Sequence, residues 1–207
     1  MSVSTKTQTD AGVEGNSRLT SMTGMVLLVL LAVEGVTLLS VRQMITLHVY
    51  LGVLLVGPVV LKCITTTYRF ARYYAGATPY VRKGPPHVVL RLVGPLVVVS
   101  SVALLGTGIG LIAAGPGHRE PLLTLHQASF IVWLGVMGIH VLGHAIEAGT
   151  DLVSEYRAPR SSPVARRRSL RLVALALSIM AGVGLATALM PTAHSWTSGS
   201  FQHDEER

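Results

Sequence analysis

The pattern of apolar and polar positions divides the chain into five long apolar segments joined by short polar connections. The segments cover residues 22–41, 45–65, 88–114, 122–146 and 170–190. An α-helix needs about 18 or more apolar residues to cross a bilayer, and every segment is long enough to do so. Pro58 and Pro95 lie inside the second and third segments, where each predicts a kink because it removes a backbone hydrogen bond. The sequence therefore predicts an all-α integral membrane protein, a helical bundle with five transmembrane helices.

Composition strengthens this interpretation. Hydrophobic residues make up 50% of the 207 positions and charged residues only 13%, which is about half of the charged fraction of a typical soluble domain. A soluble fold of this length could not bury so much apolar sequence between such short connections. We therefore expect membrane lipid to be the main surroundings of the chain.

Polar segments flank the transmembrane domain, which we place at residues 21–191. Residues 1–20 are rich in Ser, Thr, Gly and Asp, a composition that predicts a disordered tail. Residues 192–207 form the second tail. The first apolar segment has no small-residue cleavage site after it, so we expect a retained helix and not a signal peptide.

Positive charges gather in two of the four connections. Loops rich in Lys and Arg stay in the cytoplasm, so the pattern predicts a cytoplasmic N-terminus and an external C-terminus in the plasma membrane of a bacterium. Because the net charge of +7 is located in these loops and not in a soluble basic domain, it does not indicate nucleic-acid binding. The second-to-third connection carries Arg69, Arg72, Arg82 and Lys83, and the fourth-to-fifth carries Arg157, Arg160, Arg166, Arg167, Arg168 and Arg171.

The residue inventory excludes several chemistries. One cysteine, Cys63, cannot form an internal disulfide, hold an iron–sulfur cluster or provide the paired attachment site of c-type haem. The sequence shows no hydrolase triad and no glycine-rich phosphate-binding loop. A redox or transport function therefore has to rely on other side chains, and the histidines are the main candidates.

Histidines occur within or at the ends of three apolar segments. His48 lies on the second segment, His87 opens the third, and His126, His140 and His144 lie on the fourth. The expected topology places His48 with His126 at the outer level, and His87 with His140 or His144 at the inner level. His126 and His140 are 14 residues apart, nearly four helical turns or about 21 Å, so both leave one face. Imidazoles inside a membrane are functional candidates by default.

Histidines at these two depths resemble those of the membrane-embedded di-haem cytochromes b, the small quinone-linked subunits of bacterial oxidoreductases. The resemblance covers residues 22–146 when the first segment is included. It implies a four-helix haem-binding core with the fifth helix peripheral, and one or two haem b groups. In the family's pattern two helices each carry two histidines 14 residues apart. Here the position 14 residues after His48 is Lys62, so His87 has to come from the third segment instead.

The resemblance assigns roles to the histidines. His48 and His126 would ligate the outer haem iron, and His87 and His140 the inner one, with His144 as a partner of a propionate or a proton. Arg91, one turn after His87, is a candidate cation for an inner propionate. The implied function is electron transfer across the membrane between a quinone or a partner redox protein and an acceptor, as in the electron-transfer subunit of an oxidoreductase.

Two other functions stay open at the level of sequence. The same histidines could serve a metal or proton transporter, because imidazole suits Zn, Cu and Ni, or the chain could be a structural membrane subunit without a cofactor. Glu34, in the first segment, is a candidate proton relay or hydrogen-bond partner of a quinone. The alternative for Glu34 is a structural pair with Arg42 or Gln43.

Overall fold

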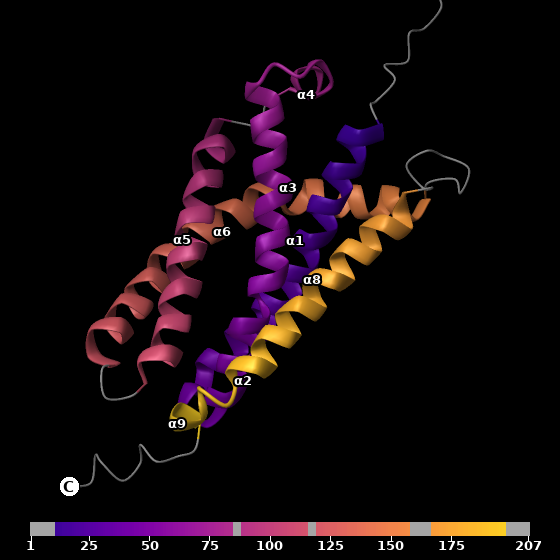
Figure 1. Ribbon diagram of the computed structural model, residues 1–207. Helices are drawn as coiled ribbons and strands as arrows, with labels where there is room; N and C mark the ends of the chain where they lie inside the picture. The colour runs from indigo at the N-terminus through magenta and orange to yellow at the C-terminus, as the bar shows by residue number, and fades with distance from the viewer. Residues whose placement is uncertain (1–10, 85–87, 116–118, 158–166, 198–207) are drawn as a thin grey trace, which may run out of the picture.

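The computed structural model describes residues 11–84, 88–115, 119–157 and 167–197 of the chain. Over these residues the chain is helical and contains no strand, which confirms the all-α class. Figure 1 shows the helices as a bundle with α4 at one end and α9 at the other, here called the α4 end and the α9 end. The helices are α1 (Ala11–Thr37), α2 (Val41–Leu54), α3 (Val56–Tyr74), α4 (Thr78–Lys83), α5 (Val88–Ala114), α6 (Arg119–Arg157), α8 (Arg168–Leu189) and α9 (His194–Thr197).

Within the described ranges, four helical stretches are long and apolar enough to cross a membrane: Gly12–Tyr74, Arg91–Ala114, Glu120–Gly143 and Arg168–Leu189. Five spans are therefore not confirmed. The difference lies in the first stretch, whose 63 residues contain both the first and the second of the expected spans. They are continuous because the short connection between them is largely helical, with non-helical dihedral angles at Met44. A 3-10 turn (Leu38–Ser40) joins α1 to α2, and the chain reverses at the non-helical dihedral angles of Ser40.

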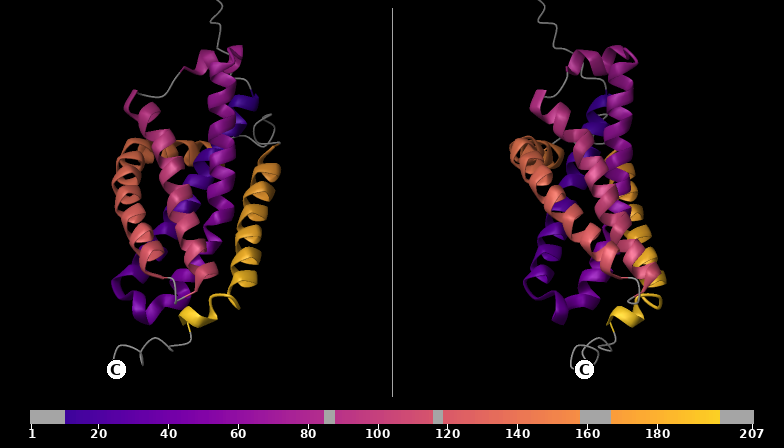
Figure 2. Two further views of the ribbon diagram at one scale, coloured as in Figure 1. Left: turned by 60° about the vertical axis from the view of Figure 1, so that its left-hand side comes forward. Right: turned by 90° about the vertical axis from the view of Figure 1, so that its left-hand side faces the viewer.

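Helix α1 begins at Ala11, so the prediction that residues 1–20 form a disordered tail is wrong for residues 11–20. These polar residues are ordered because they dock on α3, which lies beside α1 in both views of Figure 2. Asn16 Nδ2 donates to the carbonyl of Thr65 at 3.2 Å, and Lys62 Nζ donates to the carbonyl of Thr20 at 2.7 Å. Composition predicted disorder because it says nothing about such tertiary partners.

Part of the expected tail at residues 192–207 is likewise attached to the bundle. Helix α9 lies at positions 194–197, and Trp196 Nε1 donates to the carbonyl of Leu111 on α5 at 3.0 Å. Residues 1–10 and 198–207 lie outside the described residues.

Helices α2 and α3 meet at Leu55, three residues before Pro58, and Leu55 itself keeps helical dihedral angles; this join is here called the α2–α3 break. Proline cannot donate the bond that would close on the residue four positions earlier, so the carbonyl of Leu54 loses its helical partner. Helix α8 approaches at this point: a Cβ on Gly182 would lie 2.1 Å from that carbonyl oxygen. On the other side of the crossing, a Cβ on Gly57 would lie 2.0 Å from the carbonyl oxygen of Ser178. The two glycines therefore allow backbone-to-backbone contact of α8 with the α2–α3 break.

Helices α5 and α6 form the other pair of the bundle. The indole Nε1 of Trp133 on α6 donates to the Oγ of Ser101 on α5 at 3.0 Å, in a buried position. Helix α5 runs without interruption through Pro95. Helix α8 packs mainly against α2 and α3, and Figure 2 shows it on the opposite side of the bundle from the first turns of α6.

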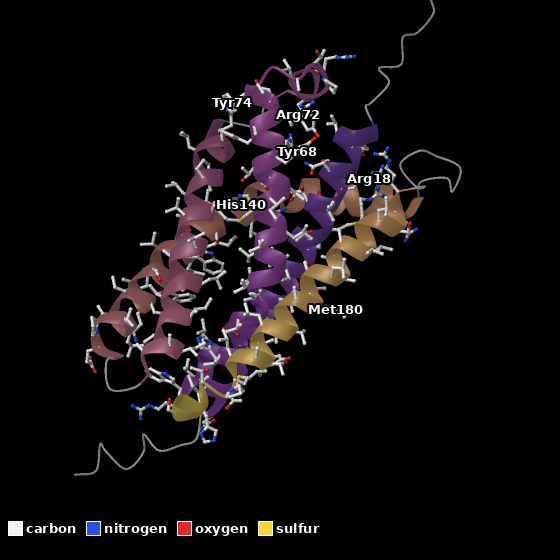
Figure 3. All side chains as sticks on the ribbon, in the orientation of Figure 1. Arg18, Tyr68, Arg72, Tyr74, His140 and Met180 are labelled. Atoms are coloured by element: carbon white, nitrogen blue, oxygen red, sulfur yellow. The ribbon has the colours of Figure 1, made fainter. Side chains whose placement is uncertain are left out.

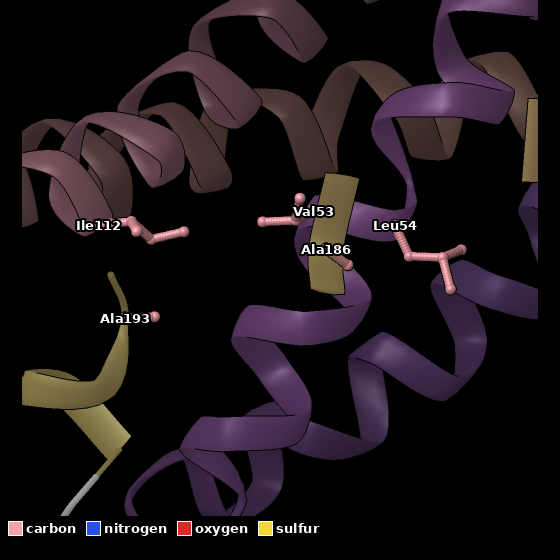
Figure 4. Close-up of a cluster of buried hydrophobic side chains, with 5 residues drawn as sticks. All are labelled: Val53, Leu54, Ile112, Ala186 and Ala193. Atoms are coloured by element: carbon pink, nitrogen blue, oxygen red, sulfur yellow. The ribbon is translucent and has the colours of Figure 1, made fainter. Parts of the chain in front are cut away.

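One cluster of buried apolar side chains lies near the α9 end. Val53 and Leu54 of α2, Ile112 of α5, Ala186 of α8 and Ala193 form a cluster of buried side chains. Figure 4 shows Ile112 and Val53 extending toward one another from their two helices. This cluster joins α2, α5 and α8 at the level where the histidines of α2 and α6 lie.

Candidate functional site

Four helices bring polar side chains together at the α9 end of the bundle. Figure 1 shows α2 and the first turns of α6 at this end, together with the last turns of α1 and α5. His48 comes from α2 and His126 from α6. Their polar partners come from the other two helices, Glu34 and Thr37 from α1 and Thr107 from α5.

The imidazole of His48 is held by α1. Its Nδ1 lies 2.7 Å from Oε1 of Glu34 and 3.1 Å from Oγ1 of Thr37. The Thr37 hydroxyl donates its hydrogen to the carbonyl of Glu34 and is fully buried, so its oxygen is left to accept from the ring. Because both neighbours of Nδ1 are acceptors, the hydrogen-bond network assigns the proton of His48 to Nδ1. The lone pair of this imidazole is therefore on Nε2.

The imidazole of His126 is held in the same manner by α5. Its Nδ1 lies 3.1 Å from Oγ1 of Thr107, whose hydroxyl donates to the carbonyl of Ala103 at 2.8 Å. Thr107 thus accepts from the ring, which again assigns the proton to Nδ1 and the lone pair to Nε2. Gly108 gives the ring its space, because a Cβ there would lie 3.2 Å from Cε1 of His126.

The two imidazoles form a close pair. Their ring centroids are 6.4 Å apart and their planes make an angle of 77°. Two imidazoles bound on opposite sides of one ion, with metal–nitrogen bonds of about 2 Å, have ring centres roughly 6.5 Å apart. The pair therefore has the spacing that two axial ligands of one iron require. In both rings the hydrogen-bond network assigns a proton to Nδ1, which leaves Nε2 as the nitrogen that could ligate a metal.

The structure places the other candidate histidines elsewhere. His140 lies further along α6, and Figure 3 shows it toward the middle of the bundle, away from the α9 end. The expected inner partner His87 lies outside the described residues, and the side chain of His144 is not described either. The pairing of His87 with His140 or His144 therefore stays a prediction.

Arg91 was expected to face an inner propionate. Its Nη2 donates to the hydroxyl of Tyr74 at 2.7 Å, and its guanidinium carbon lies 6.0 Å from the centre of that ring. Figure 3 shows Tyr74 close to the α4 end. Arg91 therefore lies among the aromatic side chains of α3, in an arrangement typical of the membrane interface.

Sequence reasoning identified Glu34 as a polar group in an apolar segment but did not identify His48 as its partner. Its carboxylate contacts His48. Thr37, Thr107 and Gly108 were missed as site residues. The signal for Thr37 lay in its spacing, since it follows Glu34 by three residues and shares its helix face. The signal for Thr107 was a hydroxyl flanked by glycines in an apolar helix.

Comparison with known proteins adds no relative to this picture: the chain matches no protein-family model, no curated protein and no solved structure at a significant level. Among the residues that the structure describes, no group of three or more His, Cys, Asp or Glu side chains is arranged to hold a metal ion. The pair of imidazoles and its surroundings are therefore the features of the structure that bear on function.

Proposed function

We propose that the chain is an integral membrane b-type cytochrome in which His48 and His126 provide both axial ligands of one haem b. The observation that supports this proposal is the pair of δ-protonated imidazoles with ring centroids 6.4 Å apart. A metal site with only protein ligands needs more donors than two. Haem iron takes four ligands from the macrocycle, so two imidazoles complete its coordination.

The residues around the pair suit this group. Haem iron with two imidazole ligands has no open position and supplies one-electron transfer without binding oxygen. Thr107 and Glu34 fix the orientation of the rings through Nδ1, which is the usual outer-shell arrangement for ligating histidines. Gly108 lets the ring of His126 lie against the backbone of α5.

A second haem would extend the path across the membrane. His140 is 14 residues beyond His126 on the same helix, so its ring lies about 21 Å further along the axis. With His87 as its partner, it would hold a haem deeper in the membrane than the pair of His48 and His126. The proposed topology has the α9 end outside and the α4 end in the cytoplasm, and electrons would pass between a quinone or a partner redox protein and an acceptor.

The experiment is to purify the chain from haem-replete cells in mild detergent and to measure the reduced-minus-oxidised absorbance spectrum and the ratio of haem to protein. We expect a b-type α band, with His48→Leu and His126→Leu each losing the same haem. His194→Leu is the matched control, because His194 lies on α9 at the same end of the bundle but outside the pair. It is expected to keep the haem content of the unchanged protein.

Two results would contradict the proposal. One is a folded protein that contains no haem; bound zinc or copper in such a sample would favour the metal transporter instead. The other is full haem content in both His48→Leu and His126→Leu, because the outer pair would then not be the ligand set.

A further inference from the structure

The two imidazoles of the pair differ in what holds them. Nδ1 of His48 faces the carboxylate of Glu34 at 2.7 Å, whereas Nδ1 of His126 faces the neutral hydroxyl of Thr107 at 3.1 Å. Hydrogen bonds to an ionised acceptor are shorter and roughly twice as strong as neutral ones. The histidine of α2 is therefore bound differently from the histidine of α6, although both belong to one pair.

We propose that Glu34 is a positioning residue that makes His48 the stronger donor of the two ligands and thereby lowers the reduction potential of the haem they hold. The inference rests on the proposed function and adds to it the residue that sets the potential. Neither the haem motif nor the histidine spacing assigns this role to Glu34.

The geometry directs the charge of Glu34 onto one partner. Its Oε1 contacts Nδ1 of His48, while its Oε2 is buried and has no hydrogen-bond partner among the described residues. Only 13% of the Glu34 side chain is exposed, and 21% of that of His48, so water screens the interaction weakly. The fully buried Thr37 hydroxyl fixes the same nitrogen from the next turn of α1.

The direction of the effect follows from the charge. A carboxylate that accepts the Nδ1 proton pulls it away from the ring and increases the electron density that Nε2 donates to a metal. Oxidised iron carries one more positive charge than reduced iron, so the stronger donor stabilises the oxidised form. Removing the charge while keeping an acceptor oxygen should shift the equilibrium toward the reduced form.

The test is a spectroelectrochemical titration of the purified holoprotein, with Glu34→Gln compared with the unchanged chain. Outer-shell substitutions at metal sites typically change affinity by 10–100-fold. We therefore expect the equilibrium ratio of reduced to oxidised haem to rise about tenfold in Glu34→Gln, which raises the reduction potential by about 59 mV for one electron. The haem signal to follow in the titration is the one that disappears in His126→Leu. Glu14→Gln, the same substitution 20 residues earlier on α1 and so roughly 30 Å away, should leave the potential unchanged.

The outcomes separate this inference from the proposed function. A protein that holds the haem but has equal potentials in Glu34→Gln and the unchanged chain overturns the role of Glu34 alone. A haem that survives the loss of His48 and His126 overturns the ligand assignment itself. If Glu34→Gln fails to fold, Thr37→Val serves as the second variant. Loss of the Thr37 acceptor would weaken the hold on the same proton and shift the potential in the same direction by less.

Discussion

A single methyl group at the crossing of α8 with the α2–α3 break is expected to force the helices apart. The Cβ of alanine at position 182 would lie 2.1 Å from the carbonyl oxygen of Leu54, whereas ordinary van der Waals contact begins at 3.4 Å. Helix α8 would have to retreat by more than 1 Å, and the obstacle is backbone, which cannot rotate away. Overpacking of this kind costs about 1–3 kcal/mol. Gly57→Ala meets the same obstacle, since its Cβ would lie 2.0 Å from the carbonyl oxygen of Ser178.

Thermal unfolding followed by circular dichroism in detergent measures this cost. For chains of 150–250 residues, 1 kcal/mol corresponds to about 2–4 °C in Tm, so each substitution should lower Tm by roughly 2–12 °C. Gly184→Ala is the matched control, because nothing lies within 4 Å of a Cβ there and alanine favours the helix over glycine. The double variant should lose less than the sum of Gly57→Ala and Gly182→Ala, since one displacement relieves both clashes. Equal effects of Gly182→Ala and Gly184→Ala would refute the close crossing.

Three further predictions concern the histidine pair and its support. Gly108→Ala should reduce haem content, because its Cβ would press on the ring of His126 at 3.2 Å, whereas Gly106→Ala has open space and should not; equal haem-to-protein ratios would contradict this. Trp133→Phe should lower stability by about 1–3 kcal/mol, since it leaves the buried Ser101 hydroxyl without its donor, as a lower Tm would show. Lys62→Met should lower Tm by breaking the α1–α3 contact yet leave the haem spectrum unchanged, and a lost haem would show that Lys62 belongs to the site.

The sequence was sufficient for the helical class and for placing His48 and His126 at one level. Apolar length predicted the helices, because a helix in lipid satisfies its own backbone hydrogen bonds. The alternating direction of the segments placed His48 and His126 at one level, and the structure brings their rings together. Both inferences used only length and periodicity, which are properties of single helices.

Features that depend on contacts between helices were harder to predict from the sequence. Residues 11–20 look disordered by composition but are helical, because Asn16 and Thr20 bond with side chains and backbone of α3. Glu34 has polar neighbours at Arg42 and Gln43 in the sequence, and the reversal of the chain after Thr37 instead brings it to His48. The rotation and tilt of each helix relative to its neighbours decide which polar side chains meet in a bundle. Neither can be predicted from the sequence of one segment.

The most direct test of the central claim is the electron paramagnetic resonance spectrum of the oxidised holoprotein in the His140→Leu variant, which isolates the outer site. We expect a low-spin ferric signal of a haem with two imidazole ligands, and the loss of that signal when either His48 or His126 is also replaced by Leu. A low-spin signal that persists without His48 and His126, or a high-spin signal in their presence, would contradict the assignment of these two residues as the axial ligands.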